Sequence, residues 1–212
     1  MIREDRIATV RALAALLVAI PAMLSLQCAA APFAVQVGEA RIALDAPPGF
    51  ADSSFTGSPR LQELAESQTS PSNKILMFAI SDGDLRRFMT GDTPEFRRYM
   101  LVVTPKAMER DRITPAAFKE LADNAARAAQ GADAAELRKD PEVFSLQLST
   151  QVPPARRGGE PQQVLPTRTL MLVRGQALDL TVLAVHESPA DVDWIRAVTS
   201  RWIEELQRLN AR

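Results

Sequence analysis

The sequence contains very few of the residues that build metal centres, disulfides and histidine-based active sites. Its 212 residues include a single cysteine, Cys28, and a single histidine, His186. One cysteine cannot form a disulfide within the chain, and the counts exclude a metal site made of several histidines or cysteines. We therefore expect no metal and no cofactor, and any chemistry that needs an imidazole has to use His186.

The chain also lacks an excess of charge of either sign, and aromatic residues are scarce. It has 25 lysines and arginines against 26 aspartates and glutamates, a formal net charge of −1, and 5% aromatic residues. A surface that binds nucleic acid needs a positive field and, for single strands, aromatic side chains on which bases stack. The composition therefore predicts no nucleic-acid partner.

Motifs for a nucleophile, a phosphate loop or a zinc protease are missing as well. The sequence has no G-x-S-x-G, no G-x-G-x-x-G and no G-x-x-x-x-G-K-[ST], and the residues after His186 lack the second histidine of H-E-x-x-H. Asp82 and Asp84 have the spacing of two cation ligands, but a calcium loop needs further acids where Leu85 and Arg86 follow. We interpret this stretch as a capped turn.

What the sequence does have is the composition of one globular domain behind a targeting segment. Apolar residues make up 46% and charged residues 24%, and the length suffices for a substantial core. The first eleven residues carry three arginines against two acids, residues 12–26 are apolar apart from Ser25, and Cys28-Ala29-Ala30-Ala31 are small. This order predicts a secretory signal peptide over residues 1–30, cleaved after Ala30, and a single domain over residues 31–212.

Two other roles for the N-terminus stay open. Residues 12–31 have about the length of one membrane span, roughly 20 residues, although Pro21 and Gln27 weaken it, and an uncleaved segment would anchor the protein in the inner membrane. A lipoprotein would be acylated on Cys28, but bacterial lipoprotein signals have a small residue where Gln27 stands. The composition favours the cleaved signal, which places the domain in the periplasm or outside the cell.

The C-terminal stretch, residues 167–210, indicates the fold most clearly. Two β-rich runs, 167–173 and 177–186, flank Arg174-Gly175-Gln176, which predicts a hairpin. The second run is apolar on both faces in its C-terminal half, so we expect a central strand covered on both sides. Ser188, Pro189 and Asp191 then have the positions of a helix cap, a first-turn proline and a capping-box acid. The helix that follows carries one apolar stripe that includes Trp202.

The rest of the chain alternates between strand and helix patterns in the same way. A strand with strict alternation at 142–151 has one polar face, so we expect it near a sheet edge with that face in water, followed by a long exposed loop over 152–166. The other expected strands are 35–44 (a strand or hairpin), 74–80 and 96–103, and the expected helices are 59–67, 82–89, 115–130 and a short one at 132–139. The sequence thus predicts an α+β fold with a single, mostly antiparallel sheet, packed helices and a long C-terminal helix.

This element order resembles the PsbP-like fold over roughly residues 31–212. It is also similar to small uncharacterised secreted proteins of proteobacteria. The resemblance implies a role in assisting the assembly of membrane complexes, which transfers only as an analogy of fold.

Arginine is the abundant cation, and it recurs as local pairs. Arg86-Arg87 and Arg97-Arg98 are the candidates for a binding site, with Arg110/Arg112 and Arg156-Arg157 as further pairs. Guanidinium groups suit carboxylates and phosphates, which predicts an acidic envelope protein or an anionic lipid as the partner. Strand alternation places Arg97 and Arg98 on opposite faces, so at most one of them should join a given site.

Trp194 lies off the apolar stripe of the last helix. It is therefore either a partner anchor or a cover for the sheet edge.

Together these features predict an exported, non-catalytic binding or accessory domain of the bacterial envelope. The alternatives are a hydrolase-type enzyme that uses His186 at a strand end and a structural subunit anchored by residues 12–31. A pocket that brings His186 together with a serine and an acid would favour the enzyme.

Overall fold

A computed structural model describes residues 31–152 and 161–211, so the expected signal peptide, residues 1–30, lies outside the described part. Short 3-10 turns occur at Ser53–Thr56 and Lys106–Met108. The elements are β1 (Phe33–Val37), β2 (Ala40–Leu44), β3 (Phe50–Asp52), α2 (Pro59–Ser67), β4 (Asn73–Ser81), α3 (Asp82–Met89), β5 (Arg98–Pro105), α4 (Pro115–Ala128), β6 (Ala134–Asp140), β7 (Val143–Leu148), β8 (Thr150–Val152), β9 (Gln162–Val173), β10 (Gln176–Val185) and α5 (Pro189–Asn210).

Within the described residues the main sheet has eight strands, and every pairing in it is antiparallel. The order is β3-β4-β5-β10-β9-β7-β6, with β8 paired to β9, while β1 and β2 form a separate hairpin. The sequence therefore predicted the α+β class correctly, including the antiparallel sheet and the long C-terminal helix.

The β9–β10 hairpin forms the centre of this sheet, as its sequence predicted. Val173 pairs with Gln176 across a two-residue turn in which Arg174 has φ 52° and Gly175 has φ 79°. Two positive φ values are characteristic of a type I′ turn, whose twist matches that of the strands. The α5 helix follows β10 directly, and its capping box forms between Ser188 and Asp191.

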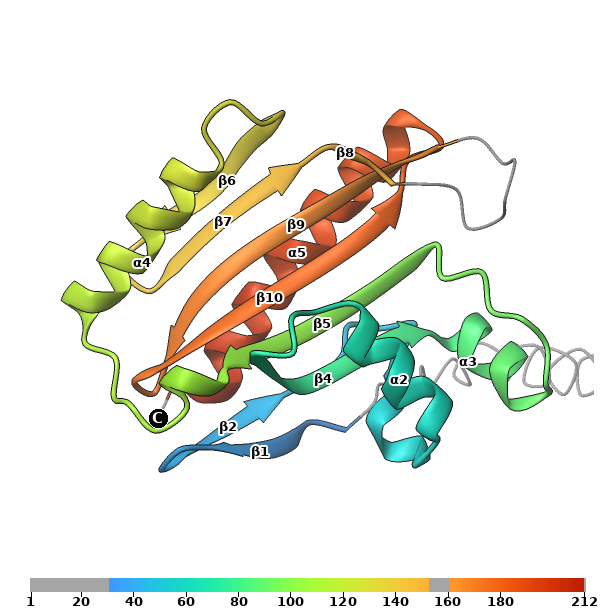
Figure 1. Ribbon diagram of the computed structural model, residues 1–212, viewed down its shortest axis with the longest axis horizontal. Helices are drawn as coiled ribbons and strands as arrows, with labels where there is room; N and C mark the ends of the chain where they lie inside the picture. Colours follow the sequence, from blue (N-terminus) through green and yellow to red (C-terminus); the bar gives the residue numbers. More distant parts are fainter. Residues whose placement is uncertain (1–30, 153–160, 212) are drawn as a thin grey trace, which may run out of the picture.

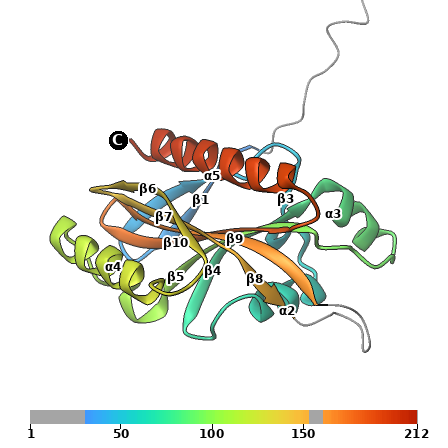
Figure 2. The same cartoon turned by 90° about the horizontal axis from the view of Figure 1, so that it is seen from above.

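The sheet separates two layers of helices. Figure 2 shows α5 on one side and α2 and α4 on the other, and Figure 1 views the sheet from the α2 and α4 side, with α5 behind the strands. The largest core lies under α5 and contains Trp202 and Leu206 together with Ile42 and Leu44 of the β1–β2 hairpin. A second core lies under α2 around Phe78, and a third lies under α4, with Phe118 at its centre.

The short helix predicted at 132–139 is wrong, because Ala134–Asp140 forms β6 at the edge of the sheet. Its composition, with Ala134, Ala135, Glu136 and Leu137, suits a helix by intrinsic preference. Pairing with β7 supplies backbone hydrogen bonds that outweigh this preference. The predicted strand 142–151 is divided into β7 and β8.

The polar face of β7 is buried, although the sequence predicted that this face would lie in water. Ser145 is 0% exposed and Gln147 is 7% exposed. The Ser145 hydroxyl hydrogen-bonds the Thr169 hydroxyl at 2.7 Å, and the Gln147 Oε1 accepts from Arg196 Nε of α5 at 2.6 Å. These partners satisfy the polar groups, so the face can lie under α5.

Two further boundaries and one burial assignment differ from the sequence prediction. The strand expected at 96–103 begins at Arg98, since Phe96 has φ 49°. Of the loop expected at 152–166, residues 162–166 belong to β9. The face of β10 that carries Thr181 and Leu183 is only half-buried, because α2 and α4 cover the sheet on either side of it.

No helix within residues 31–152 and 161–211 is long and apolar enough to span a membrane. The alternative anchor, residues 12–31, lies almost wholly outside these ranges.

Candidate functional site

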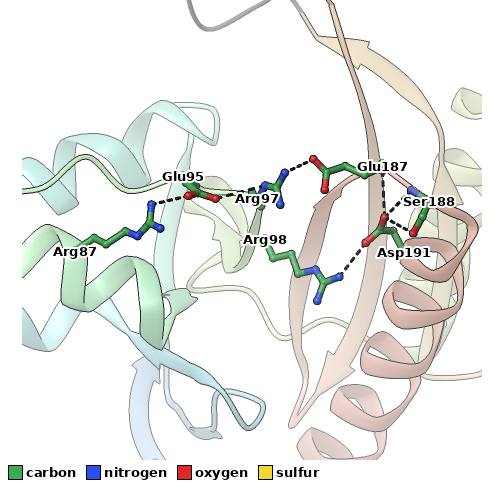
Figure 3. Close-up of polar contacts among 7 residues, drawn as sticks. All are labelled: Arg87, Glu95, Arg97, Arg98, Glu187, Ser188 and Asp191. Atoms are coloured by element: carbon green, nitrogen blue, oxygen red, sulfur yellow. Dashed lines mark hydrogen bonds and ion pairs between the residues drawn. The ribbon is translucent and has the colours of Figure 1, made fainter.

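The arginines that the sequence singled out come together at the end of the sheet where β10 passes into α5. Arg87 of α3 forms an ion pair with Glu95 at 2.5 Å. Arg97 forms two ion pairs, one with Glu95 at 3.5 Å and one with Glu187. Figure 3 shows these side chains as a continuous row. The row connects α3 with the segment before β5 and the segment after β10.

Arg98 extends this network to the N-terminus of α5. Its Nη2 donates to Asp191 Oδ1 at 2.9 Å, and the other Asp191 oxygen accepts from the backbone N–H groups of Glu187 at 3.1 Å and Ser188 at 2.9 Å (Figure 3). The Arg98 hydrogen bond, followed by the backbone hydrogen bonds, lowers the pKa of Asp191 from 3.8 to about 2. Asp191 therefore stays ionised at any physiological pH.

These residues line a cavity of about 410 Å³ in which acids match the arginines. Arg97 and Arg98 both line it, so the expectation that only one of them joins a given site is wrong: β5 begins at Arg98, so Arg97 precedes the strand and strand alternation does not fix its side chain. The charged lining residues are Arg87, Arg97, Arg98, Asp84, Glu95, Glu187 and Asp191. Three cations against four acids give no excess positive charge, and we interpret the network as a link between elements.

Two other predicted site residues, Arg86 and Trp194, do not line this cavity. Arg86 is exposed on α3 and forms no ion pair within residues 31–152 and 161–211. Trp194 is half-buried, with the Arg98 guanidinium 3.9 Å from its ring centroid and the Phe50 ring 6.1 Å away. It therefore covers the sheet near the edge strand β3, which is the structural one of its two predicted roles.

His186 follows the end of β10 and is half-buried, and among the described residues its ring has none of the hydrogen-bond partners of a catalytic base. Its backbone N–H donates to the Gln163 carbonyl at 2.9 Å, and its Nδ1 is buried with no hydrogen-bond partner among the described residues. The nearby Ser188 hydroxyl donates to Asp191 at 3.2 Å. Within the described part of the chain, no hydrogen bond brings His186 together with a serine and an acid.

A second charged cavity, which the sequence analysis did not identify, lies at the opposite end of β10. It has a volume of about 470 Å³ and is lined by Arg41, Arg110, Arg112, Arg174, Glu39, Ala40 and Gln176. We call it the four-arginine cavity. Three chain segments meet there: the start of β2, the loop before α4, and the β9–β10 turn (Figure 1, lower left).

Hydrogen bonds and close contacts fix these three segments to one another. Arg174 Nη1 donates to the Arg41 carbonyl at 3.0 Å, and the Ile113 backbone N–H donates to the Gly175 carbonyl at 2.8 Å. The side chain of Arg112 passes over Gly175, where an added Cβ would lie 3.0 Å from Arg112 Cγ. The turn thus holds the loop that carries Arg110 and Arg112.

None of these four arginines forms an ion pair among the described residues, whereas Arg87, Arg97 and Arg98 all do. Four guanidinium groups against Glu39 leave an excess of three positive charges around the cavity. Guanidinium groups collected in this way can bind an anion through charge-assisted hydrogen bonds. The sequence showed Arg110/Arg112 as a pair and Arg174 in a turn, but nothing local to those positions signals that Arg41 joins them.

Comparisons with known proteins do not identify the chain. No protein-family model matches the sequence, and no curated protein matches it. Among solved structures, the Ran-binding protein Mog1p of Saccharomyces cerevisiae is similar at a TM-score of 0.39 and 12% identity, over 86% of this chain and 93% of that one. A mutant of the protein Mog1 is similar at a TM-score of 0.39 and 13% identity, over 86% of this chain and 94% of that one. Similarities this weak carry no conclusion about function.

Proposed function

We propose that this protein is an exported, non-catalytic binding domain of the bacterial envelope that captures an anionic partner in the four-arginine cavity. The observation that carries the proposal is that four arginines from three segments line one cavity without an ion pair among the described residues. A hydrogen bond to a charged group contributes about 1.5–3 kcal/mol, so several guanidinium groups can hold an anion firmly. The partner is an acidic envelope protein or an anionic lipid, as the abundance of arginine suggested.

Export is the second part of the proposal, supported by the basic start, apolar run and small residues of segment 1–30. When the whole sequence is expressed, the protein recovered from the envelope fraction is expected to begin at Ala31. A protein that still begins at Met1 in the membrane fraction would contradict the cleaved signal and favour the membrane anchor. The PsbP-like resemblance of the element order also remains part of this proposal, and it is compatible with an accessory role.

Titration of the protein with small anions tests the binding part. In calorimetry at low salt, we expect phosphate, sulfate, citrate or succinate to bind the wild type, and the variant Arg110→Ala with Arg112→Ala to bind at least about tenfold more weakly. The matched control is Arg127→Ala with Arg201→Ala, which removes the same charge from exposed positions on α4 and α5. Equal loss in both double variants, or no binding at all, overturns the proposal.

A further inference from the structure

We infer that the four-arginine cavity binds a phosphate monoester that carries a neighbouring hydroxyl, as in a polyol phosphate or a lipid headgroup that ends in glycerol phosphate. The inference rests on the proposed function, because it names the chemical class of the anion that this same cavity takes. The inference specifies two properties of that anion: it carries more than one negative charge, and it has a hydrogen-bond donor beside the charged oxygens.

The charge of the cavity favours an anion with more than one negative charge. Elsewhere in the protein one carboxylate is enough for one or two arginines: Glu95 serves Arg87 and Arg97, and Asp191 serves Arg98. The four guanidinium groups of the cavity exceed what a single carboxylate can pair. A phosphate monoester brings about −1.5 to −2 charges and three acceptor oxygens at neutral pH, and its oxygens match the planar fork of guanidinium donors.

Two of the four arginines, Arg112 and Arg174, are held in place before any ligand arrives. Arg174 is held by its hydrogen bond to the Arg41 carbonyl, and Arg112 lies against Gly175. The β1–β2 turn packs against the backbone just before Arg110, because a Cβ added at Gly38 would lie 2.4 Å from the Glu109 carbonyl oxygen. Arginines that are already positioned lose less side-chain freedom when an anion binds, which favours a compact ligand.

Gln176 accounts for the hydrogen-bond donor in the inferred ligand. It lines the cavity at 5% exposure, and its Oε1 is buried with no hydrogen-bond partner among the described residues. The β1–β2 turn packs near the other end of the same amide, because a Cβ added at Gly38 would lie 3.3 Å from Nε2. A buried acceptor without a partner is unfavourable, and a hydroxyl on a ligand bound against this amide would satisfy it. Ionised phosphate and carboxylate oxygens cannot do so, since they carry no proton and only accept.

Three soluble probes test the inference on the unmodified protein. We expect glycerol 3-phosphate to bind about fivefold more tightly than propyl phosphate, which has the same charged group and chain length but no hydroxyl. We expect both to bind more tightly than succinate, a dianion made of carboxylates. If succinate binds as tightly as the two phosphates, or if the two phosphates bind equally, the inference fails while the proposed anion-binding function stands. If none of the anions binds, the proposed function itself fails.

A substitution then tests whether the ligand hydroxyl donates to Gln176. Gln176→Met removes the amide with little change in length, so the fivefold advantage of glycerol 3-phosphate should disappear while the affinity for propyl phosphate stays unchanged. A persistent advantage in a folded variant overturns the role of Gln176. Should the variant fail to fold, the comparison of the two phosphates on the wild type decides alone.

Vesicles distinguish the source of the phosphate. Binding to vesicles that contain phosphatidylglycerol phosphate, whose headgroup ends in a monoester beside a free hydroxyl, identifies a lipid headgroup if it is absent with phosphatidylcholine and displaced by glycerol 3-phosphate. Binding of soluble glycerol 3-phosphate without vesicle binding identifies a free phosphate ester, and either result supports the inference. Capture of a polyglutamate peptide, with binding of neither phosphate, overturns it and points to an acidic protein.

Discussion

The Asp191 carboxylate accepts a hydrogen bond from the Arg98 guanidinium at 2.9 Å, although the two residues lie 93 positions apart in the sequence. The same carboxylate caps the helix to which it belongs. One side chain thus connects the first residue of β5 to the N-terminus of α5. The same guanidinium lies 3.9 Å from the Trp194 ring centroid, so the pair also positions the aromatic cover of the sheet. Removing the charge of Asp191 therefore affects two elements at once.

The low pKa of Asp191 predicts a stability effect that depends on pH. Its pKa is 3.8 in the unfolded chain and about 2 in the folded protein, so its contribution is complete above about pH 4 and is lost as the pH falls towards 2. Because the Arg98 side chain is 37% exposed, solvent screens the pair, and we expect Asp191→Asn to lower the unfolding free energy at pH 6 by about 1–2 kcal/mol. Urea denaturation of both proteins at pH 6 and pH 2.5 measures this. If the difference in unfolding free energy between the two proteins is the same at pH 2.5 as at pH 6, the ionised Asp191 carboxylate is not its cause.

Gly175 and Gly83 should respond oppositely to alanine. Gly175 has φ 79°, and its added Cβ would approach Arg112 Cγ to 3.0 Å, so Gly175→Ala should destabilise the protein by about 1–2 kcal/mol. Gly83 lies in α3 without a positive φ, and its Cβ would meet only Ser81 Oγ at 3.8 Å. Gly83→Ala should leave the melting temperature unchanged or raise it, because alanine favours the helix. A similar loss for both variants would show that the turn geometry is not the cause.

Local signals in the sequence were enough for the helices that form, although the same signals also predicted a helix at 132–139, where the chain forms β6. The Ser58-Pro59 and Thr114-Pro115 starts were predicted correctly, and the Thr114 hydroxyl accepts from the Ala117 N–H at 3.2 Å as a helix cap should. The central β10 strand and the turn at Arg174 were also predicted from local patterns. Each of these depends on residues within a few positions of one another.

Features that depend on distant partners were not predictable in the same way. The polar face of β7 is buried because Thr169 and Arg196 supply its hydrogen bonds, and no pattern within β7 shows that. The ion pairs that neutralise Arg97 and Arg98 come from Glu187 and Asp191, some ninety residues later. The four-arginine cavity forms only where the β1–β2 hairpin, the loop before α4 and the β9–β10 turn meet.

The buried hydroxyls of Thr167 and Thr199 should show strong coupling. They hydrogen-bond each other at 2.9 Å between β9 and α5, at 0% and 2% exposure. Thr167→Val or Thr199→Val alone leaves one buried hydroxyl without a partner and should cost about 1–3 kcal/mol, whereas the double variant should cost less than the sum. A double-mutant cycle by chemical denaturation measures the coupling. Strict additivity would indicate that the two hydroxyls act independently.

The α5 helix should be required for folding. Trp202 is 2% exposed, and its Nε1 donates to the Asp45 carbonyl at 2.8 Å, which ties α5 to the segment after β2. Trp202→Ala should cost about 3–5 kcal/mol, a large part of a typical total of about 5–15 kcal/mol. Its exposed neighbour Arg201 provides the control, since Arg201→Ala should change stability by less than about 0.5 kcal/mol. Truncation before Ser188 should give an unfolded product, and a truncated protein with an unchanged melting temperature would contradict the role of α5.

The function of this protein should not depend on histidine, and His186→Gln tests this directly. General acid–base catalysis at neutral pH usually needs an imidazole or a carboxylate that contacts a nucleophile or the substrate. His186 has no hydrogen bond at Nδ1 among the described residues, and the nearest capping serine, Ser188, donates to Asp191. We therefore expect the variant to keep the wild-type melting temperature to within a few degrees, the wild-type affinity for glycerol 3-phosphate and any envelope phenotype.

The variant Arg97→Ala with Arg98→Ala provides the contrast for this test. It removes the ion pairs with Glu187 and Asp191, so it should lower the melting temperature while leaving anion binding in the four-arginine cavity intact. Hydrolysis of a nitrophenyl ester by the full chain, measured in the wild type and in His186→Gln, completes the comparison. If the wild type hydrolyses the ester and His186→Gln loses that activity at an unchanged melting temperature, the hydrolase alternative takes precedence. The serine and the acid should then be sought around the end of β10.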